Sequence, residues 1–390
     1  MSQTAIDALE LSRSVVEAAQ AAVVLANSTE KLASTLGVLG PIIGVAAITV
    51  KLSLSNVDSP ELAFMKEQFQ AVRNQLNVIS GQISEVLREI ERSTINNQYF
   101  PIEENLKNQF RKYMDILNAA PEFRQKQKEE FLKHFNATKG DQNLHTLYDG
   151  VMGFTAVFGK SILETAMNCD QRNRRLMEGL CARLKNLFCI GLIAVLGHAG
   201  ITGNDVKALE TEWNQKLAEA ESKMKSTVDR CIHEFAEQAK IDVERLVKEK
   251  GGRDNKECSS YVRDKLKNKY DWVRWSVRVY DPVIGFDNHC YIGPNPNRFH
   301  FFRLNNVNIV VSYTTDPKPV DKSRLNHLMN GKDGWKDPLK VAEHISQNLS
   351  GGHVVHTVRR YKGLWGAWNF PDGCHYWKNY SGVTLCVHPV

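Results

Sequence analysis

The chain has 390 residues, of which 42% are hydrophobic and 24% are charged, with 50 Lys and Arg against 44 Asp and Glu. This length allows two or three domains, and the composition excludes an intrinsically disordered chain. The eight cysteines include no CxxC pair, which excludes a zinc ribbon or finger. Because no basic segment precedes an apolar one at the N-terminus, we expect a soluble, leaderless protein with reduced thiols. Such a protein is cytoplasmic or released without a signal peptide, and associates with membranes only on activation.

The first predicted element is an uncharged, glycine-rich run of 19 residues at 32–50, bounded by Lys31 and Lys51. As a helix it would extend about 28 Å, close to the roughly 30 Å hydrocarbon core of a bilayer. Its glycines are typical of hairpins or of close helix packing, so a permanent membrane span is the weakest interpretation. A buried hairpin and a hairpin that inserts conditionally both stay open. The candidate membrane-inserting residues are Leu36, Val38, Leu39, Ile42, Ile43, Val45 and Ile48.

Long helices are expected next. Apolar residues recur every three or four positions from Leu62 to Ile90, the seam of a coiled coil or a long bundle. Pro101 predicts a break before a helix over 106–117. Further helices are expected over about 141–185 and over 205–249.

A second uncharged run of 19 residues lies between these last two helices, at 186–204. It has the length of the first run and is also glycine-rich, and the same two interpretations apply to it. A pair of such runs is expected to act together, stored in the bundle or inserted in a bilayer. Its candidate membrane-inserting residues are Leu187, Phe188, Ile190, Leu192, Ile193, Val195 and Leu196.

The pattern changes after a glycine-containing linker predicted at 251–258, which separates a helical domain (1–250) from a second domain (259–390). Residues 251–390 hold 20 Lys and Arg against 12 Asp and Glu, a balance of +8. Alternating residues predict a half-buried strand over 273–279, with further strands over 306–314, 353–361 and 382–390 and a short helix over 337–349. We expect a basic, β-rich α+β domain, whose charge favours anionic partners.

Aromatic residues gather near the C-terminus at 361–380. Exposed, they would bind a membrane interface or stack on sugars, and the candidate surface- or glycan-binding residues are Trp365, Trp368, Tyr376 and Trp377. Buried, they would form the core of the domain, and we expect burial for two of the three tryptophans.

No pattern in the sequence indicates catalysis, so no catalytic residue, metal ligand or cofactor is assigned. His289-Cys290 and Cys374-His375 carry thiols and imidazoles, but nothing in their spacing makes them converge on a metal or form a nucleophile pair. Walker and Rossmann glycine patterns and a calcium loop are absent from the sequence. Nucleic acid is not an expected partner, because its binding requires basic and aromatic residues in one groove, and the sequence by itself gives no sign of such a groove.

Several segments resemble a known family. "LGPIIGVAA", "SPELAFMKEQF", "NQLNVISGQISEVLREIE", "NNQYFPIEENLKNQFRKY" and "VYDPVIGFDNHCY" resemble the fish rapunzel proteins, which are similar to the cephalotoxin-like proteins. The resemblance implies a long helical bundle followed by a β-rich domain, and it supplies no catalytic residues to assign to this chain. The helical half is also similar in architecture to α-helical pore-forming toxins, which is an analogy of fold only.

These observations predict an α+β protein with an elongated N-terminal bundle of long helices and a smaller β-rich domain. The leading hypothesis is a non-enzymatic, membrane-active protein whose C-terminal domain docks on a lipid membrane or glycan surface. Homo-oligomers of it would enclose a pore. The alternative is an intracellular helical scaffold or signalling regulator that never inserts.

Overall fold

The computed structural model describes residues 96–390 except 155–160, 170–171, 250–251, 295–297, 350 and 361, together with scattered positions between 63 and 88. The first uncharged run, with its candidate residues from Leu36 to Ile48, lies outside the described residues. The chain divides into two compact units, Met1–Ile232 and His233–Val390.

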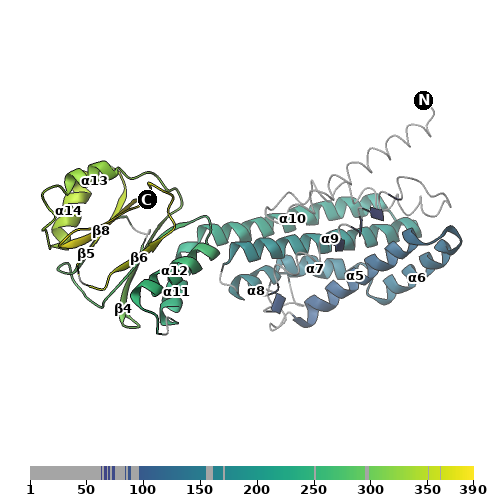
Figure 1. Ribbon diagram of the computed structural model, residues 1–390. Helices are drawn as coiled ribbons and strands as arrows, with labels where there is room; N and C mark the ends of the chain where they lie inside the picture. Colours follow the sequence, from purple (N-terminus) through teal and green to yellow (C-terminus); the bar gives the residue numbers. More distant parts are fainter. Residues whose placement is uncertain are drawn as a thin grey trace, which may run out of the picture. The chain divides into compact units, whose positions relative to one another are not determined.

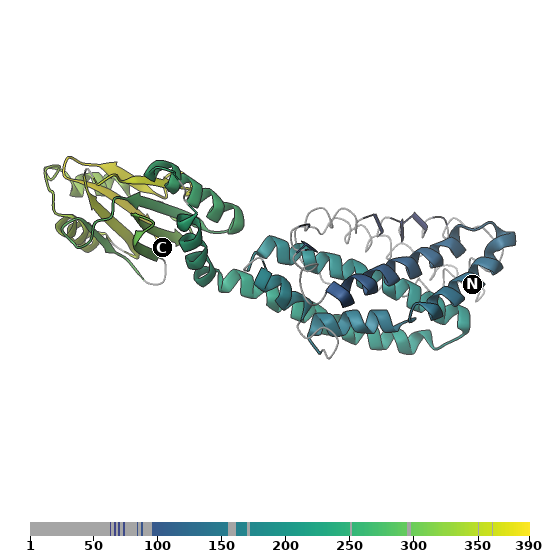
Figure 2. The same ribbon diagram turned by 90° about the horizontal axis from the view of Figure 1, so that it is seen from below.

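The first unit is a bundle of helices (Figures 1 and 2). Its described elements are α5 (Asn96–Asn118), the 3₁₀ turn η1 (Pro121–Phe123), α6 (Arg124–Ala137), α7 (Gln142–Met152), α8 (Ile162–Cys169), α9 (Arg174–Thr202) and α10 (Val206–His233). Helix α5 packs on α6, α7 and α9, so α5 and α9 form the middle of the bundle. Of the residues in the predicted seam at 62–90, Phe69 is described; it is helical, fully buried and part of the bundle core.

Helix boundaries in this unit differ from the sequence-based expectation. Pro101 lies inside α5, near its N-terminal end, and does not break it. The helix expected over 141–185 is divided: α7 ends at Gly153, whose φ of 86° terminates a helix, and α9 begins after Asn173, whose side chain accepts a hydrogen bond from the Leu176 amide. Helix α9 then continues through the second uncharged run as far as Thr202, so that run is a helix and not a hairpin.

The second unit is a four-layered α/β/β/α domain (Figure 1). Its helices are α11 (Phe235–Lys248), α12 (Asn255–Lys269), α13 (Lys322–Leu328) and α14 (Pro338–Asn348). Its strands are β1 (Arg274–Tyr280), β2 (His289–Ile292), β3 (Arg298–Leu304), β4 (Val307–Thr314), β5 (His353–Arg359), β6 (Trp365–Trp368), β7 (Tyr376–Asn379) and β8 (Val383–Pro389). Four of these strands, β1, β4, β5 and β8, and helix α14 lie where the sequence predicts them.

The strands form two antiparallel sheets, sheet 1 in the order β3-β4-β1-β6 and sheet 2 in the order β2-β5-β8-β7. Helices α11 and α12 cover the outer face of sheet 1, and α14 covers the outer face of sheet 2. The edge strands β2 and β3 therefore belong to different sheets, as do β6 and β7. Strands β3 and β4 are joined by Asn305 and Asn306, both with positive φ (46° and 60°), which is the two-residue hairpin turn that matches strand twist.

The boundary between the units lies earlier than the predicted one at 250. Phe235, Val243 and Val247 of α11 pack into the same apolar cluster as Trp275 and Tyr313 of sheet 1, so α11 belongs to the second unit. The predicted linker 251–258 likewise runs into α12, whose first turn is capped by Asp254 through a 2.7 Å hydrogen bond from the Glu257 amide. Heptad-like apolar spacing continues across the break at Glu234, which is why the sequence merged α10 with α11.

Strand β1 is buried on both faces, whereas alternation predicted one solvent-facing side. Its apolar residues, Trp275, Val277 and Val279, face α11 and α12, as expected. Ser276 and Arg278 on the other face are also fully buried, because sheet 2 covers that face. The interior between the two sheets is therefore partly polar.

Candidate functional site

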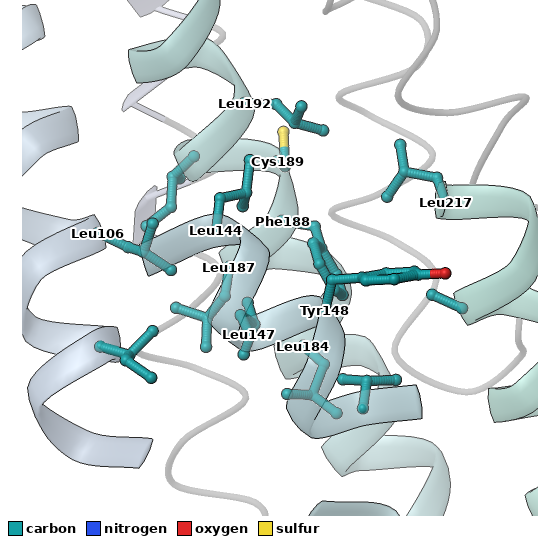
Figure 3. Packing of buried hydrophobic residues seen from close by; sticks show 14 of the residues in the cluster. Leu106, Leu144, Leu147, Tyr148, Leu184, Leu187, Phe188, Cys189, Leu192 and Leu217 are labelled. Carbon is teal, nitrogen blue, oxygen red and sulfur yellow. The ribbon is translucent and has the colours of Figure 1, made fainter. Parts of the chain in front are cut away.

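The seven predicted membrane-inserting residues of the second run all lie on α9 and are all buried. They are Leu187, Phe188, Ile190, Leu192, Ile193, Val195 and Leu196. Figure 3 shows Leu187, Phe188 and Leu192 among leucines of α5, α7 and α10. Among the described residues, α9 is the one helix long and apolar enough to cross a bilayer, and 89% of its most apolar 18-residue stretch is buried.

Two glycines of α9 leave space in which side chains of neighbouring helices pack. A Cβ at Gly191 would lie 2.6 Å from Leu144 Cδ1, and a Cβ at Gly197 would lie 2.3 Å from Tyr113 Cε2. Both distances are far below van der Waals contact, so only glycine admits Leu144 and Tyr113 this close to the helix axis. Of the two interpretations of the glycines, a hairpin or close helix packing, the contacts at Gly191 and Gly197 support close packing within the bundle.

A buried ion pair holds the N-terminal half of α9 to α5. The guanidinium of Arg183 contacts both carboxylate oxygens of Glu103, with 3.2 Å between Arg183 Nε and Glu103 Oε2, and the side chains are only 4% and 6% exposed. Lys107 also pairs with Glu103. Burial by itself raises the pKa of Glu103, but the charges of Arg183 and Lys107 outweigh burial and hold that pKa below its ordinary value.

The predicted aromatic site lies where β6 and β7 meet at one edge of the two sheets. Trp365 and Trp368 of β6 are 49% and 36% exposed, Trp377 of β7 is half-buried, and Tyr376 is buried. The expectation that two of the three tryptophans are buried was therefore wrong. Both β6 and β7 are four-residue edge strands, so neither strand is covered by a further one.

These aromatic rings are ordered by stacking. The ring of Trp368 stacks on His375, with centroids 4.4 Å apart, and on Trp377, with centroids 5.6 Å apart. Gly366 leaves room for Trp377, since a Cβ there would lie 2.6 Å from its ring. A groove of about 460 Å³ runs beside them, and its lining includes Trp368, Trp377, Lys322 and Lys378. Trp365 lies on the other face of β6, where Lys256 Nζ of α12 is 5.3 Å from the centre of its ring. We call the exposed surface of Trp368 and Trp377, together with Trp365, the tryptophan edge.

The two His-Cys pairs do not form a joint site. His289 faces the interior between the sheets, whereas its neighbour Cys290 packs on the outer face of sheet 2 with Val341 and Ile345 of α14. Within the described part of the chain, no three His, Cys, Asp or Glu side chains are placed to hold a metal ion. Sulfur and imidazole do meet elsewhere: Cys386 Sγ lies 3.4 Å from His375 Nε2.

Burial raises the pKa of Cys386 and lowers that of His375, so this thiol and this imidazole are both neutral. An activated nucleophile pair requires the opposite, a thiolate beside an imidazolium.

Sequence reasoning missed a cluster of buried polar side chains between the sheets. Arg278 is fully buried; its Nε donates to His356 Nδ1 (3.1 Å), and its Nη1 donates to the hydroxyls of Ser276 and Ser312 (2.6 and 2.8 Å). Among the described residues, no carboxylate pairs with this guanidinium. The available signal was the alternation of Ser276 and Arg278 in β1, which we assigned to solvent.

The described elements define a class of protein: a helical bundle that buries one bilayer-length apolar helix, followed by an α/β/β/α domain with exposed aromatic residues. Residues 56–252 match the cephalotoxin-like middle helical domain. The chain is also 40% identical over 200 residues to Protein rapunzel of zebrafish, Danio rerio. The aligned region covers 51% of this chain and 88% of that protein. The chain therefore belongs to the rapunzel and cephalotoxin-like family. No solved structure matches it.

Proposed function

We propose that this protein is a non-enzymatic, membrane-active, toxin-like protein. The bundle stores the apolar segment of α9, and the second unit docks on a lipid membrane through the tryptophan edge. On release, α9 inserts into the bilayer, and several copies assemble around a pore. The observation that carries the proposal is the combination of bilayer length and near-complete burial in α9.

Three further features support it. Membership in the cephalotoxin-like family agrees with a toxin-like role. Exposed tryptophans are favoured at the boundary between lipid headgroups and acyl chains. The +8 balance of residues 251–390 favours an anionic surface.

The experiment is dye release from anionic and zwitterionic vesicles, with a variant that locks α9 in the bundle. The double variant Leu144→Cys/Gly191→Cys carries one thiol on α7 and one on α9. A Cβ at position 191 would lie 3.6 Å from the present position of Leu144 Cγ, which is about where the sulfur of a cysteine at position 144 would lie. That separation allows a disulfide between α7 and α9. We expect the reduced variant to release dye and the oxidised variant to bind vesicles without releasing it.

Leu144→Cys alone, treated with the same oxidant, is the matched control and is expected to release dye in both states. The proposal fails if the wild-type chain neither releases dye nor sediments with either vesicle at pH 7 or pH 5. It also fails if the oxidised variant releases dye as fast as the reduced one. Binding to immobilised glycans in place of vesicles would assign the tryptophan edge to glycan docking.

A second candidate function is an intracellular helical scaffold or signalling regulator in which α9 stays in the core. The specific observation in its favour is the close fit of Leu144 and Tyr113 against Gly191 and Gly197. This alternative predicts that Leu192→Asp unfolds the bundle, because an unpaired carboxylate would replace a fully buried side chain. It also predicts that the oxidised lock leaves every activity of the protein intact.

A further inference from the structure

A second cavity lies at the opposite edge of the β domain, between edge strands β2 and β3. It has a volume of about 290 Å³, and we call it the β2–β3 cavity. Its inner wall is formed by His289 and Tyr291 of β2 and by His300 of β3. Arg298 also lines it, with the guanidinium 4.3 Å from the centre of the Tyr291 ring.

Three polar atoms in the inner wall have no hydrogen-bond partner among the described residues. They are His289 Nδ1, Tyr291 Oη and His300 Nε2. His289 and Tyr291 are each only 8% exposed. Buried polar atoms are almost always paired, so three such atoms around one cavity indicate a polar group that belongs there.

The charge behind this wall is positive. His356 packs against His289, Tyr291 and His300, with ring centroids 5.9, 6.0 and 6.5 Å away, and it accepts a hydrogen bond from Arg278. Arg278 Nη2 is also without a partner in the described part of the chain. A buried guanidinium stays charged and is costly without a compensating anion. The residues that line the cavity include no carboxylate.

The direction of the hydrogen bonds near the cavity also favours a negatively charged ligand. Because His356 Nδ1 accepts from Arg278, the neutral ring carries its proton on Nε2, which is a donor. Burial raises the pKa of Tyr291, so its hydroxyl is also a donor. These donors and the two guanidinium groups favour a ligand atom that only accepts hydrogen bonds and that carries negative charge.

The mouth of the cavity is apolar. Ile284, Phe286 and Phe302 line it and are 55%, 61% and 43% exposed, unusually high values for large hydrophobic side chains that surround a polar wall. A metal ion does not fit this arrangement, because the nearest charged groups are the cations of Arg278 and Arg298.

We propose that the β2–β3 cavity binds an oxyanion carried on an apolar chain, such as the phosphate or carboxylate of a single-chain lipid. The oxyanion accepts a hydrogen bond from the Tyr291 hydroxyl and lies beside His289 Nδ1 and His300 Nε2, each of which donates in the tautomer that carries its proton there. The chain lies along Phe286 and Phe302 toward solvent. This site is independent of α9 and of the tryptophan edge, so it goes beyond the proposed function.

The test is calorimetric titration of the full chain with octyl phosphate, octanoate, inorganic phosphate and octanol, each below its aggregation concentration. We expect octyl phosphate and octanoate to bind, inorganic phosphate to bind about tenfold more weakly because the apolar contact is missing, and octanol not to bind. Spectra of the protein labelled with ¹⁵N in its histidine rings should show shifts that require the anionic head.

Three variants distinguish binding of the anionic head of the ligand from binding of its apolar chain. Tyr291→Phe keeps the ring and should weaken octyl phosphate and inorganic phosphate alike, by about tenfold, because one hydrogen bond to a charged group is lost. Phe286→Ser, at an exposed position, should weaken octyl phosphate alone. Tyr380→Phe makes the same chemical change on the outer face of sheet 2 and should have no effect.

The proposal is overturned if neither anionic amphiphile binds, which would mean that ordered water satisfies the buried donors. It is also overturned if octanol binds as tightly as octyl phosphate, or if Tyr291→Phe and Tyr380→Phe weaken binding equally.

Discussion

Gly197 of α9 faces the ring of Tyr113 of α5 so closely that a Cβ on the glycine would lie 2.3 Å from Tyr113 Cε2. The ring is fully buried between helices, with the rings of Phe69 and Phe131 beside it at centroid distances of 6.5 and 5.8 Å. This contact therefore tests whether α9 packs tightly against α5 in the bundle.

We therefore expect Gly197→Ala to destabilise the bundle by about 1–3 kcal/mol, because overpacking forces the helices apart. This loss opposes the gain of roughly 1 kcal/mol in helix propensity that alanine brings. Chemical denaturation followed by circular dichroism at 222 nm measures the difference. Gly252→Ala is the control, since a Cβ there meets nothing within 4 Å. A stabilised Gly197→Ala would contradict the observed contact between α5 and α9.

The second prediction concerns the buried ion pair. Arg183→Met leaves the Glu103 carboxylate buried with only Lys107 as an ionic partner, and we expect a loss of about 3–5 kcal/mol. Replacing both residues, in Arg183→Met/Glu103→Leu, should recover much of that loss, because no buried charge remains unpaired. Denaturation of the two variants and of the Glu103→Leu single variant completes a double-mutant cycle. If the double variant is as unstable as Arg183→Met, the cost arises from packing and not from charge.

The third prediction is a loss of stability in the β domain on acidification. Burial lowers the pKa of His388 to about 3, and burial together with Arg278 lowers the pKa of His356 well below its ordinary value. The unfolded chain binds protons on these rings near pH 6.5, whereas the folded domain does not, so stability falls as the pH drops below about 6.5. Each such histidine contributes a slope of about 1.4 kcal/mol per pH unit down to its folded pKa.

Tryptophan fluorescence during denaturation at pH 7, 6 and 5 measures this slope. His388→Gln should make it shallower, because a glutamine does not take up a proton. The exposed His327→Gln is the matched control and is expected to keep the wild-type slope. Equal stability at pH 7 and pH 5 would show that these rings are not held neutral in the folded domain.

The fourth prediction concerns the tryptophan edge. Trp365 is 49% exposed, so Trp365→Ala removes the contacts of the other half of the side chain and should lower the free energy of unfolding by about 1–2 kcal/mol, leaving the domain folded. The same change should weaken sedimentation with anionic vesicles by about tenfold, because an interfacial tryptophan loses its buried area on the membrane. Phe123→Ala, at a 57% exposed aromatic in the bundle, is the control and should bind like wild type. Equal binding by all three proteins would place the docking surface elsewhere.

Much of the fold could be predicted from local patterns. Apolar spacing placed helices before residue 250, and alternation placed β1. Strands β4, β5 and β8 were also predicted, and all four strands lie in the middle of a sheet. The edge strands β2, β6 and β7 were missed, since four residues carry little periodic signal. Strand β3 is as long as β1 but was missed because only Phe299 in it is buried, so its residues show no alternation of buried and exposed positions. The break at Glu234 was missed for a related reason: the apolar spacing continues from a helix that packs in the bundle into one that packs on a sheet.

Some properties of the candidate sites could likewise be predicted from the sequence, and others depend on tertiary packing. The sequence by itself determined that 186–204 is apolar, uncharged and long enough to cross a bilayer, because hydropathy and length are properties of the residues alone. Only the tertiary structure decided that its glycines receive Leu144 and Tyr113, and that Arg278 faces a second sheet and not water. Periodicity assigns residues to two faces of an element, but the surface that covers each face comes from distant parts of the chain. The β2–β3 cavity, with its buried polar wall and the positive charge behind it, forms because the two sheets pack against each other.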